Sequence, residues 1–249
     1  MNRMLKRILI VLCVLALVLF GVGAWYVNDY YHANSTALAA MEDGDNDKGT
    51  TSPVTPVSVQ ALSEKAVAFV PSQPHAGFIF YPGAKVQPEA YAPLMRRCAE
   101  QGVLSILVKP TFNLAILDPT AADGLAQHFP AIGHWFIGGH SLGGVVASQY
   151  AADHPGDFDA VVLLGSYSTA DLSAFDGDVL LVCGGNDQVL NRQKYEEAKS
   201  NLPTTARELV IQGGNHAQFG NYGEQAGDGT ATISAVDQQS QTAAAIANL

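Results

Sequence analysis

The centre of the chain reads His134-Trp-Phe-Ile-Gly-Gly-His-Ser-Leu-Gly-Gly-Val-Val146. Its apolar start, Trp135 to Ile137, predicts a short buried strand, and the run that begins at Leu142 predicts a helix. Between them lies the pattern G-x-S-x-G (residues 139–143), in which a tight turn lifts the serine above the sheet edge. The N-terminus of the following helix supplies N–H groups where an oxyanion would form. Ser141 is therefore the candidate nucleophile, although a chance match is the alternative in a chain with 24 glycines.

Length and composition restrict the class of protein. The 249 residues suit one α/β domain with a tail rather than two full domains. The formal net charge of −10 argues against attraction to nucleic acid or to an anionic membrane. Three cysteines cannot build a disulfide framework. Cys98 falls in a helix pattern and Cys183 in a strand pattern, so we interpret both as small buried side chains rather than as a pair.

The N-terminal segment predicts a membrane anchor over residues 1–31. Arg3, Lys6 and Arg7 precede an uncharged run from Ile8 to Val27, which is long enough to cross a bilayer as a helix. Basic residues before the run place the N-terminus in the cytoplasm and the rest of the chain outside it. The alternative is a secretory signal cleaved near residues 22–24, after which the protein would be secreted.

Residues 32–56 predict a linker, because an acidic run is followed by a segment rich in threonine and proline with little to bury. The acids Asp43, Asp45 and Asp47 resemble the start of a calcium loop, but the glutamate that such a loop requires downstream is missing. The folded domain is then expected over residues 57–249.

Within that domain, strand and helix patterns alternate. An alternating order of this kind indicates an α/β fold with a mostly parallel sheet of about eight strands and helices on both faces. The first two strands are short enough to form an antiparallel hairpin. We predict strands at 57–62, 66–70, 76–81, 103–108, 135–138, 160–164, 179–183 and 207–211, and helices at 88–101, 120–129, 142–153, 191–201 and 237–249.

A serine nucleophile requires a general base and a carboxylate that orients it, in the chain order serine, acid, histidine for this elbow. Asp187 follows the strand at 179–183, and His216 follows the strand at 207–211. Both therefore fall at the carboxyl edge of the sheet, where function gathers in parallel sheets. Alone, Asp187 could be a turn residue and His216 a polar loop residue, but three agreeing placements favour a triad. The weaker candidates for the acid are Asp171, Asp176 and Asp178.

The oxyanion hole is expected to take one donor from the backbone N–H of Leu142, directly after the nucleophile. The second donor should come from the loop after the third strand, where either Gly83 or Ala84 can provide it. His140 adjoins the nucleophile but should point elsewhere, in a supporting role. We find no His/Cys/Asp cluster with the spacing of metal ligands and no phosphate loop, so no cofactor or metal is expected.

Several segments resemble the bacterial "alpha/beta hydrolase family 5-like" group within the α/β-hydrolase superfamily. They are Phe80-Tyr-Pro-Gly-Ala-Lys-Val86, Phe112-Asn-Leu-Ala-Ile-Leu-Asp-Pro119, Gly138-Gly-His-Ser-Leu-Gly-Gly144, Gly213-Gly-Asn-His-Ala-Gln-Phe-Gly220 and Gly227-Asp-Gly-Thr-Ala-Thr-Ile233. The similarity covers about residues 57–240. It implies an α/β-hydrolase fold, esterase-type chemistry and a triad at Ser141, Asp187 and His216. One departure is Ala84, where a second glycine is expected.

Together these features predict a serine hydrolase that cleaves a carboxylic ester through an acyl-enzyme. The connection at residues 165–178 is too short for a large cap, so small or surface-exposed acyl groups fit better than long lipid tails. The expected partner is a small acyl ester or a cell-envelope acyl substrate, with no nucleic acid. The alternatives are an acyltransferase or an amidase with the same triad, or a binding module that keeps only the fold. The oligomeric state and the natural substrate stay open.

Overall fold

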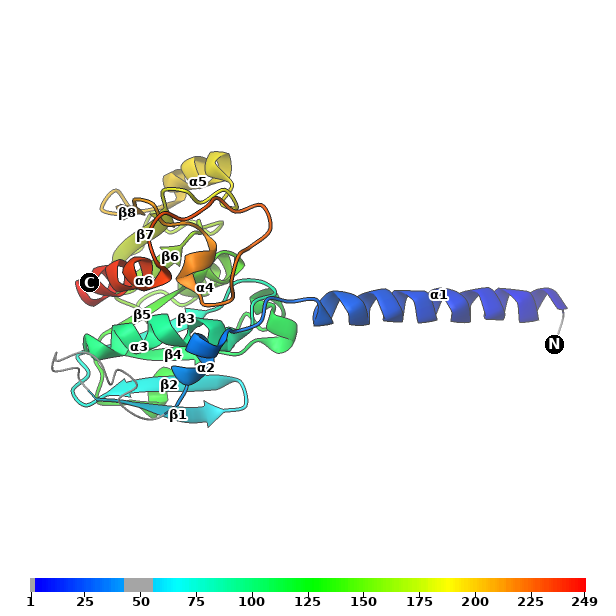
Figure 1. Cartoon of the computed structure of the whole chain (residues 1–249), viewed down its shortest axis with the longest axis horizontal. Coiled ribbons are helices and arrows are strands. Elements are labelled where there is room, and N and C mark those ends of the chain that lie inside the picture. Colours follow the sequence, from blue (N-terminus) through cyan, green and yellow to red (C-terminus); the bar gives the residue numbers. More distant parts are fainter. Residues whose placement is uncertain (1–2, 43–55) are drawn as a thin grey trace. The chain divides into compact units, whose positions relative to one another are not determined.

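The computed structural model describes residues 3–42 and 56–249. It divides into two units, of which the first is residues 1–30 and the second is Tyr31–Leu249. Figure 1 shows the helix of the first unit, α1 (Arg3–Asn28), and the mixed sheet and surrounding helices of the second.

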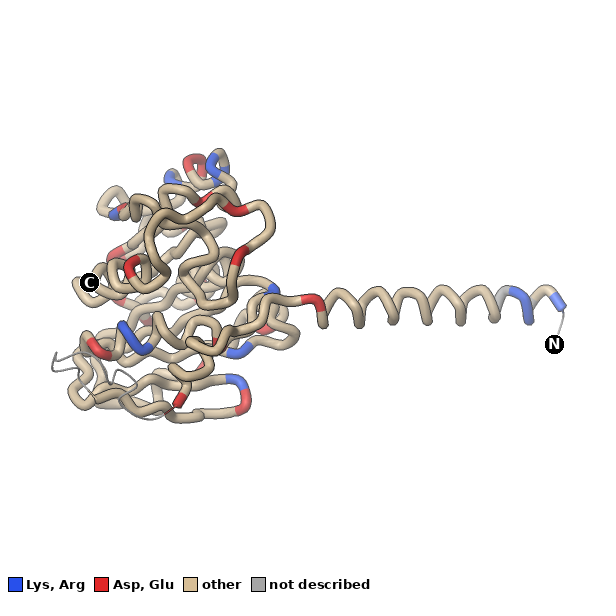
Figure 2. The backbone as a smooth tube through the Cα atoms, viewed as in Figure 1, with Lys and Arg blue, Asp and Glu red and all other residues tan. Residues whose placement is uncertain are grey.

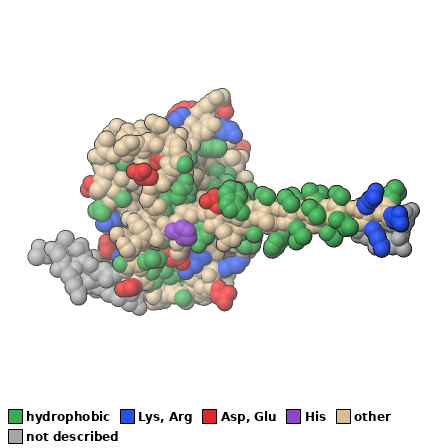
Figure 3. All heavy atoms as spheres, turned by 45° about the vertical axis from the view of Figure 1, so that its right-hand side comes forward, with side chains coloured by type: hydrophobic (Ala, Val, Ile, Leu, Met, Phe, Trp, Pro, Cys, Tyr) green, Lys and Arg blue, Asp and Glu red, His purple; other side chains and the backbone are tan. Residues whose placement is uncertain are grey.

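Helix α1 is long and apolar enough to cross a membrane over Ile10–Asn28, none of which is buried. Figure 2 shows its basic residues near the N-terminal end, followed by an uncharged run up to the acidic residue just after the helix. Apolar side chains cover the face of the helix seen in Figure 3. A signal sequence near an N-terminus has the same properties, so this helix alone is weak evidence for an anchor.

The second unit is built on one eight-stranded sheet in the order β1-β2-β4-β3-β5-β6-β7-β8. The pairs β1–β2 and β2–β4 are antiparallel and every other pair is parallel. The prediction of a mostly parallel sheet with an antiparallel entry hairpin is confirmed. The strands are β1 (Val57–Ser63), β2 (Ala66–Pro71), β3 (Ala76–Tyr81), β4 (Val103–Val108), β5 (Trp135–His140), β6 (Ala160–Leu164), β7 (Asp178–Gly184) and β8 (Arg207–Ile211).

Helices cover both faces of the sheet, as expected. On one face, Leu94 and Met95 of α3 and Ile246 of α6 join the core, and on the other face Ala147 of α4 and Tyr195 of α5 do so. Cys98 and Cys183 are free buried thiols on opposite faces of the sheet, because Cys98 belongs to the first core and Cys183 to the second. The helices of this unit are α2 (Ser35–Ala39), α3 (Ala92–Glu100), α4 (Leu142–Asp153), α5 (Arg192–Ala198) and α6 (Ala235–Ala247), with short 3-10 turns η1 (Pro88–Tyr91), η2 (Thr111–Asn113), η3 (Ala115–Leu117), η4 (Ala126–His128), η5 (Lys199–Asn201) and η6 (Ala217–Phe219).

The helix predicted at residues 120–129 is wrong. This segment consists of turns and the single 3-10 turn η4. Gly124 adopts φ +71°, which interrupts a helix. The Tyr81 hydroxyl also accepts the N–H of Ala122 and donates to the carbonyl of Pro119, so it fixes the backbone in turns.

The folded unit begins earlier than residue 57. Tyr31 pairs with Val86, and the Tyr31 N–H donates to the Lys85 carbonyl at 2.7 Å. Ala37 of α2 is fully buried and Asn34 caps that helix, so residues 31–42 belong to the domain. The acidic and threonine/proline-rich core of the expected linker, at 43–55, lies outside the described residues.

Candidate active site

Ser141 occupies the sharp turn between β5 and α4. Its backbone torsions, φ 52° and ψ −123°, lie in a region that residues other than glycine rarely adopt, as expected for a nucleophile elbow. The turn depends on its glycines, since a Cβ on Gly139 or Gly143 would clash with the backbone carbonyl of Tyr81. The sequence therefore forces the serine into a half-buried, strained position at the carboxyl edge of the sheet.

The backbone of Ser141 is held from both sides. Its N–H donates to the Leu164 carbonyl at 2.9 Å, which ties the elbow to β6. Its own carbonyl accepts from the buried Ser166 hydroxyl at 2.6 Å and from the N–H of Gly144 at 3.1 Å. Among residues 3–42 and 56–249, the Ser141 hydroxyl makes no hydrogen bond, so the conformation of the turn does not depend on it.

The predicted acid and base lie together in the interior. His216 Nδ1 and Asp187 Oδ2 are 2.8 Å apart, and the two side chains are 1% and 0% exposed. The other oxygen of Asp187 accepts the N–H groups of Val189 at 3.0 Å and Leu190 at 2.8 Å. This carboxylate can only accept at Nδ1, so neutral His216 carries its proton there and leaves Nε2 as a base.

Two neighbouring residues, Gly165 and His140, connect the Ser141 turn with the Asp187–His216 pair. Gly165 directly follows the residue that accepts the Ser141 N–H, and a Cβ on Gly165 would lie 2.9 Å from His216 Nδ1 and 3.2 Å from Asp187 Oδ2. The ring of His140, which precedes the serine, has its centroid 4.3 Å from that of His216. His216 Nε2 is buried and has no hydrogen-bond partner in the described part of the chain, Ser141 included.

The loop after β3 carries both candidates for the second oxyanion donor. The Gly83 N–H donates to the Tyr91 hydroxyl at 3.1 Å. The N–H of Ala84 has no partner among the described residues, and the N–H of Leu142 is one of the unpaired donors at the start of α4. Gly83 is therefore already engaged, whereas Ala84 and Leu142 retain free donors.

Tyr91 and His140 form a buried pair behind this loop. The Tyr91 hydroxyl accepts the Gly83 N–H at 3.1 Å and lies at hydrogen-bond distance, 2.8 Å, from His140 Nδ1. Burial, together with the nearby His216, holds the pKa of His140 well below its ordinary value. Burial also raises the pKa of the Tyr91 hydroxyl. Both groups are therefore neutral at physiological pH.

The weaker candidates for the acid lie apart from this pair. The carboxylate of Asp171 accepts the N–H of Ser173 at 2.9 Å, and that of Asp178 pairs with Arg207 at 3.3 Å. No hydrogen bond or ion pair in the described part of the chain links Asp176 to His216. Among the described residues, no group of three or more His, Cys, Asp and Glu could hold a metal ion.

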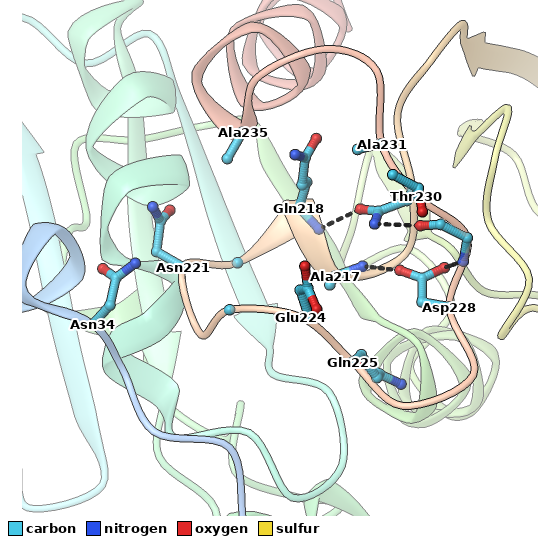
Figure 4. A pocket seen from close by; sticks show the side chains of 14 residues that line it. Asn34, Ala217, Gln218, Asn221, Glu224, Gln225, Asp228, Thr230, Ala231 and Ala235 are labelled. Atoms are coloured by element: carbon cyan, nitrogen blue, oxygen red, sulfur yellow. Dashed lines mark hydrogen bonds between the residues drawn. The ribbon is translucent and has the colours of Figure 1, made fainter.

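Sequence reasoning missed two contributors to the site. Tyr91 was assigned only to a helix pattern, and no local signal marks its hydroxyl. Asp228 lies in the glycine-rich motif at 227–233, which had no assigned role. Its carboxylate accepts the Ala217 N–H at 2.9 Å, directly after His216 (Figure 4). The motif itself was the available signal.

A polar cavity of about 370 Å³ adjoins the loop at residues 212–220, which carries His216 and is called the base loop below (Figure 4). Its walls are mostly the segment 215–235, with Asn34 contributed from the N-terminus of α2. Ser141 and His216 are not among its lining residues, so this cavity does not enclose the candidate nucleophile.

Comparisons with known proteins agree with this architecture. The model of the α/β-hydrolase family matches residues 77–240. The chain therefore belongs to the α/β-hydrolase family, which confirms the expected fold class. No curated protein matches the sequence.

Solved structures show the same fold at low identity. A predicted CIB-like hydrolase from Thermoplasma acidophilum has a TM-score of 0.56 and 12% identity, over 78% of this chain and 100% of that one. Dienelactone hydrolase from Anabaena variabilis has a TM-score of 0.53 and 20% identity, over 78% and 95%. The esterase domain of a Rhodothermus marinus protein has a TM-score of 0.56 and 14% identity, over 74% and 90%.

Proposed function

We propose that this protein is a serine hydrolase that cleaves a carboxylic ester through an acyl-enzyme. The observation that carries the proposal is the buried Asp187–His216 hydrogen bond of 2.8 Å beside the strained elbow of Ser141. A hydrolase fold and an esterase among its structural neighbours are consistent with it.

In the proposed reaction, Ser141 Oγ attacks the acyl carbonyl while His216 Nε2 takes the hydroxyl proton. Asp187 stabilises the imidazolium that forms. The proton then passes to the leaving alcohol, and the ester bond breaks to give the acyl-enzyme. Water, deprotonated by His216, attacks the acyl group and releases the acid and free Ser141. Catalytic hydrogen bonds are often looser without substrate, which accounts for the unpaired Nε2.

The oxyanion hole in this proposal uses the N–H groups of Leu142 and Ala84. Ala84 is favoured over Gly83 because the Gly83 N–H already donates to Tyr91. A fixed donor of this kind typically contributes about 3 kcal/mol to transition-state stabilisation. The missing second glycine at position 84 does not remove the donor, because alanine retains its N–H.

Two further features bear on the substrate and location. The connection between β6 and β7 contains no helix in the described structure, which favours small or accessible acyl groups over lipid tails. We also propose that α1 anchors the protein in the cell membrane with residues after 28 outside the cytoplasm, because the three basic residues precede the apolar run.

The decisive test treats the full-length chain, in a mild detergent, with a fluorophosphonate probe beside Ser141→Ala. We expect labelling of the wild type alone, followed by turnover of short-chain p-nitrophenyl esters. A folded wild type that resists the probe would reject the catalytic proposal in favour of a binding module. Labelling without ester hydrolysis would direct attention to acyl transfer or amide cleavage by the same serine.

A further inference from the structure

The segment 228–232 lies between the loops that carry the predicted acid and base. It reaches the base loop through two hydrogen bonds: the Thr232 N–H donates to the Gly213 carbonyl at 2.7 Å, and Asn215 Nδ2 donates to the Gly229 carbonyl at 2.8 Å. Neither bond involves the reacting groups. They attach the segment to two of the three residues that precede His216.

The same segment also contacts the loop that carries Asp187, called the acid loop. Asn186 Nδ2 donates to the Thr230 carbonyl at 2.8 Å. Gly229 packs so closely on the Asn186 carbonyl that a Cβ at position 229 would clash with it. Asn186 directly precedes Asp187, so segment 228–232 holds the residues before both members of the pair.

Asp228 then holds the residues after both members. Its Oδ2 accepts the Ala217 N–H at 2.9 Å, and its Oδ1 accepts the Gln188 N–H at 3.3 Å. Ala217 follows His216 and Gln188 follows Asp187. Figure 4 shows the Asp228 side chain directed at Ala217, with a dashed line for this hydrogen bond. One carboxylate therefore joins the two loops, and its Oδ1 also accepts the Gly229 N–H at 2.8 Å.

The acid loop and the base loop differ in the hydrogen bonds that fix their functional side chains. Asp187 is fixed by two backbone N–H groups of its own loop. In contrast, among the described residues the His216 side chain bonds Asp187 alone, and its loop is a short 3-10 turn preceded by Gly213 and Gly214. The base therefore has more need of support from outside its own loop.

We propose that Asp228 is a positioning residue, which sets the distance and angle of the Asp187–His216 hydrogen bond by fixing the backbone after each. The proposal rests on the function proposed above. A carboxylate suits the role, because it offers both oxygens as acceptors and forms stronger hydrogen bonds to N–H groups than a neutral amide does. An amide in its place would offer one oxygen and direct an NH₂ group at an N–H.

The test compares Asp228→Asn with Asp237→Asn in the full-length chain. Asp237 is a matched control, because its carboxylate also accepts a backbone N–H, that of Ser234 at 3.3 Å, in the capping box of α6. We expect D228N to lower kcat by about tenfold or more with KM within about twofold, since a misplaced base affects the reaction rather than binding. D237N should keep kcat within about twofold.

A second readout does not depend on turnover. The proton between His216 Nδ1 and Asp187 should give a low-field ¹H resonance that D228N shifts or broadens and D237N leaves unchanged. Should D228N not fold, Asp228→Ser, which retains one acceptor oxygen, replaces it. Unchanged kcat and an unchanged resonance in the Asp228 variant would overturn the proposal. An unreactive wild type would instead reject the hydrolase function, while the resonance would still test Asp228.

Discussion

The imidazole rings of His140 and His216 lie 4.3 Å apart between centroids and are tilted by 47°. His140 ends β5, and His216 follows β8, so neighbours in space come from the centre and one edge of the sheet. His140 also bonds Tyr91, which accepts the Gly83 N–H. A series of buried contacts thus connects the loop of the proposed base with the loop of the proposed oxyanion hole.

Replacing Tyr91 by phenylalanine removes the hydroxyl that fixes Gly83. The loop that presents the Ala84 N–H then loses a buried anchor, so we expect kcat to fall by about tenfold with little change in KM. Steady-state kinetics with a short-chain ester measure the effect. Tyr195→Phe is the control, because Tyr195 is also buried and its hydroxyl bonds Glu208 of β8 at 2.7 Å rather than the loop after β3. Equal kcat values for the two variants would contradict the assigned geometry.

Gly165→Ala should abolish most of the activity. Gly165 has φ +50°, and the new methyl group would press on His216 Nδ1 and Asp187 Oδ2. The backbone strain costs about 1–2 kcal/mol of stability, and displacement of the pair should lower kcat/KM by about a hundredfold. Gly156→Ala introduces only the backbone strain, because φ is +87° and nothing lies within 4 Å of a Cβ added at this position. A similar activity loss in both variants would point to general destabilisation.

His140 should lower the free energy of unfolding as the pH falls below about 6.5. Burial holds its folded pKa well below the ordinary value of 6.5, so below that pH the unfolded chain binds a proton that the folded chain excludes. The contribution is complete above pH 6.5 and is lost as the pH falls towards the folded pKa. Urea unfolding at pH 7.5 and 5.5 should show about 1 kcal/mol less pH dependence in His140→Gln than in the wild type. The exposed His134→Gln should behave as the wild type.

Cys98 should resist alkylation in the native state. Burial raises the pKa of its thiol from 9.0 to about 12, so at pH 8 roughly one thiol in ten thousand is ionised. Iodoacetamide followed by peptide mass spectrometry should modify Cys98 only after guanidinium unfolding. The raised thiol pKa should also lower the free energy of unfolding as the pH rises above 9, because the unfolded thiol releases its proton first. Rapid native labelling would show that α3 opens.

The sequence determines the main chain of the site well. The glycines around Ser141 and the apolar strands on either side act locally, so the elbow and the order of acid and base follow from pattern alone. The expected position of Asp187 and His216 at one sheet edge requires only that the strands be parallel. Their hydrogen bond of 2.8 Å is consistent with that reasoning.

Other features depend on contacts that a linear pattern does not contain. Residues 120–129 have apolar spacing typical of a helix, but Gly124 and the Tyr81 hydroxyl impose turns. The domain begins at Tyr31 because that residue pairs with Val86, some fifty residues later. Asp228 acquires its partners only when the loops after β7 and β8 come together, so its local sequence predicts a polar turn and nothing more.

In the described part of the chain, the hydrogen bonds that hold Ser141 all involve its backbone, through Leu164, Ser166 and the first turn of α4. The chemistry of this residue and its architecture are therefore separable. A chromosomal copy with alanine at this position should accumulate to normal levels and still occupy any partner that recognises its surface. A phenotype of that strain would report lost turnover rather than lost protein, and any substrate that accumulates in it would identify what the protein acts on.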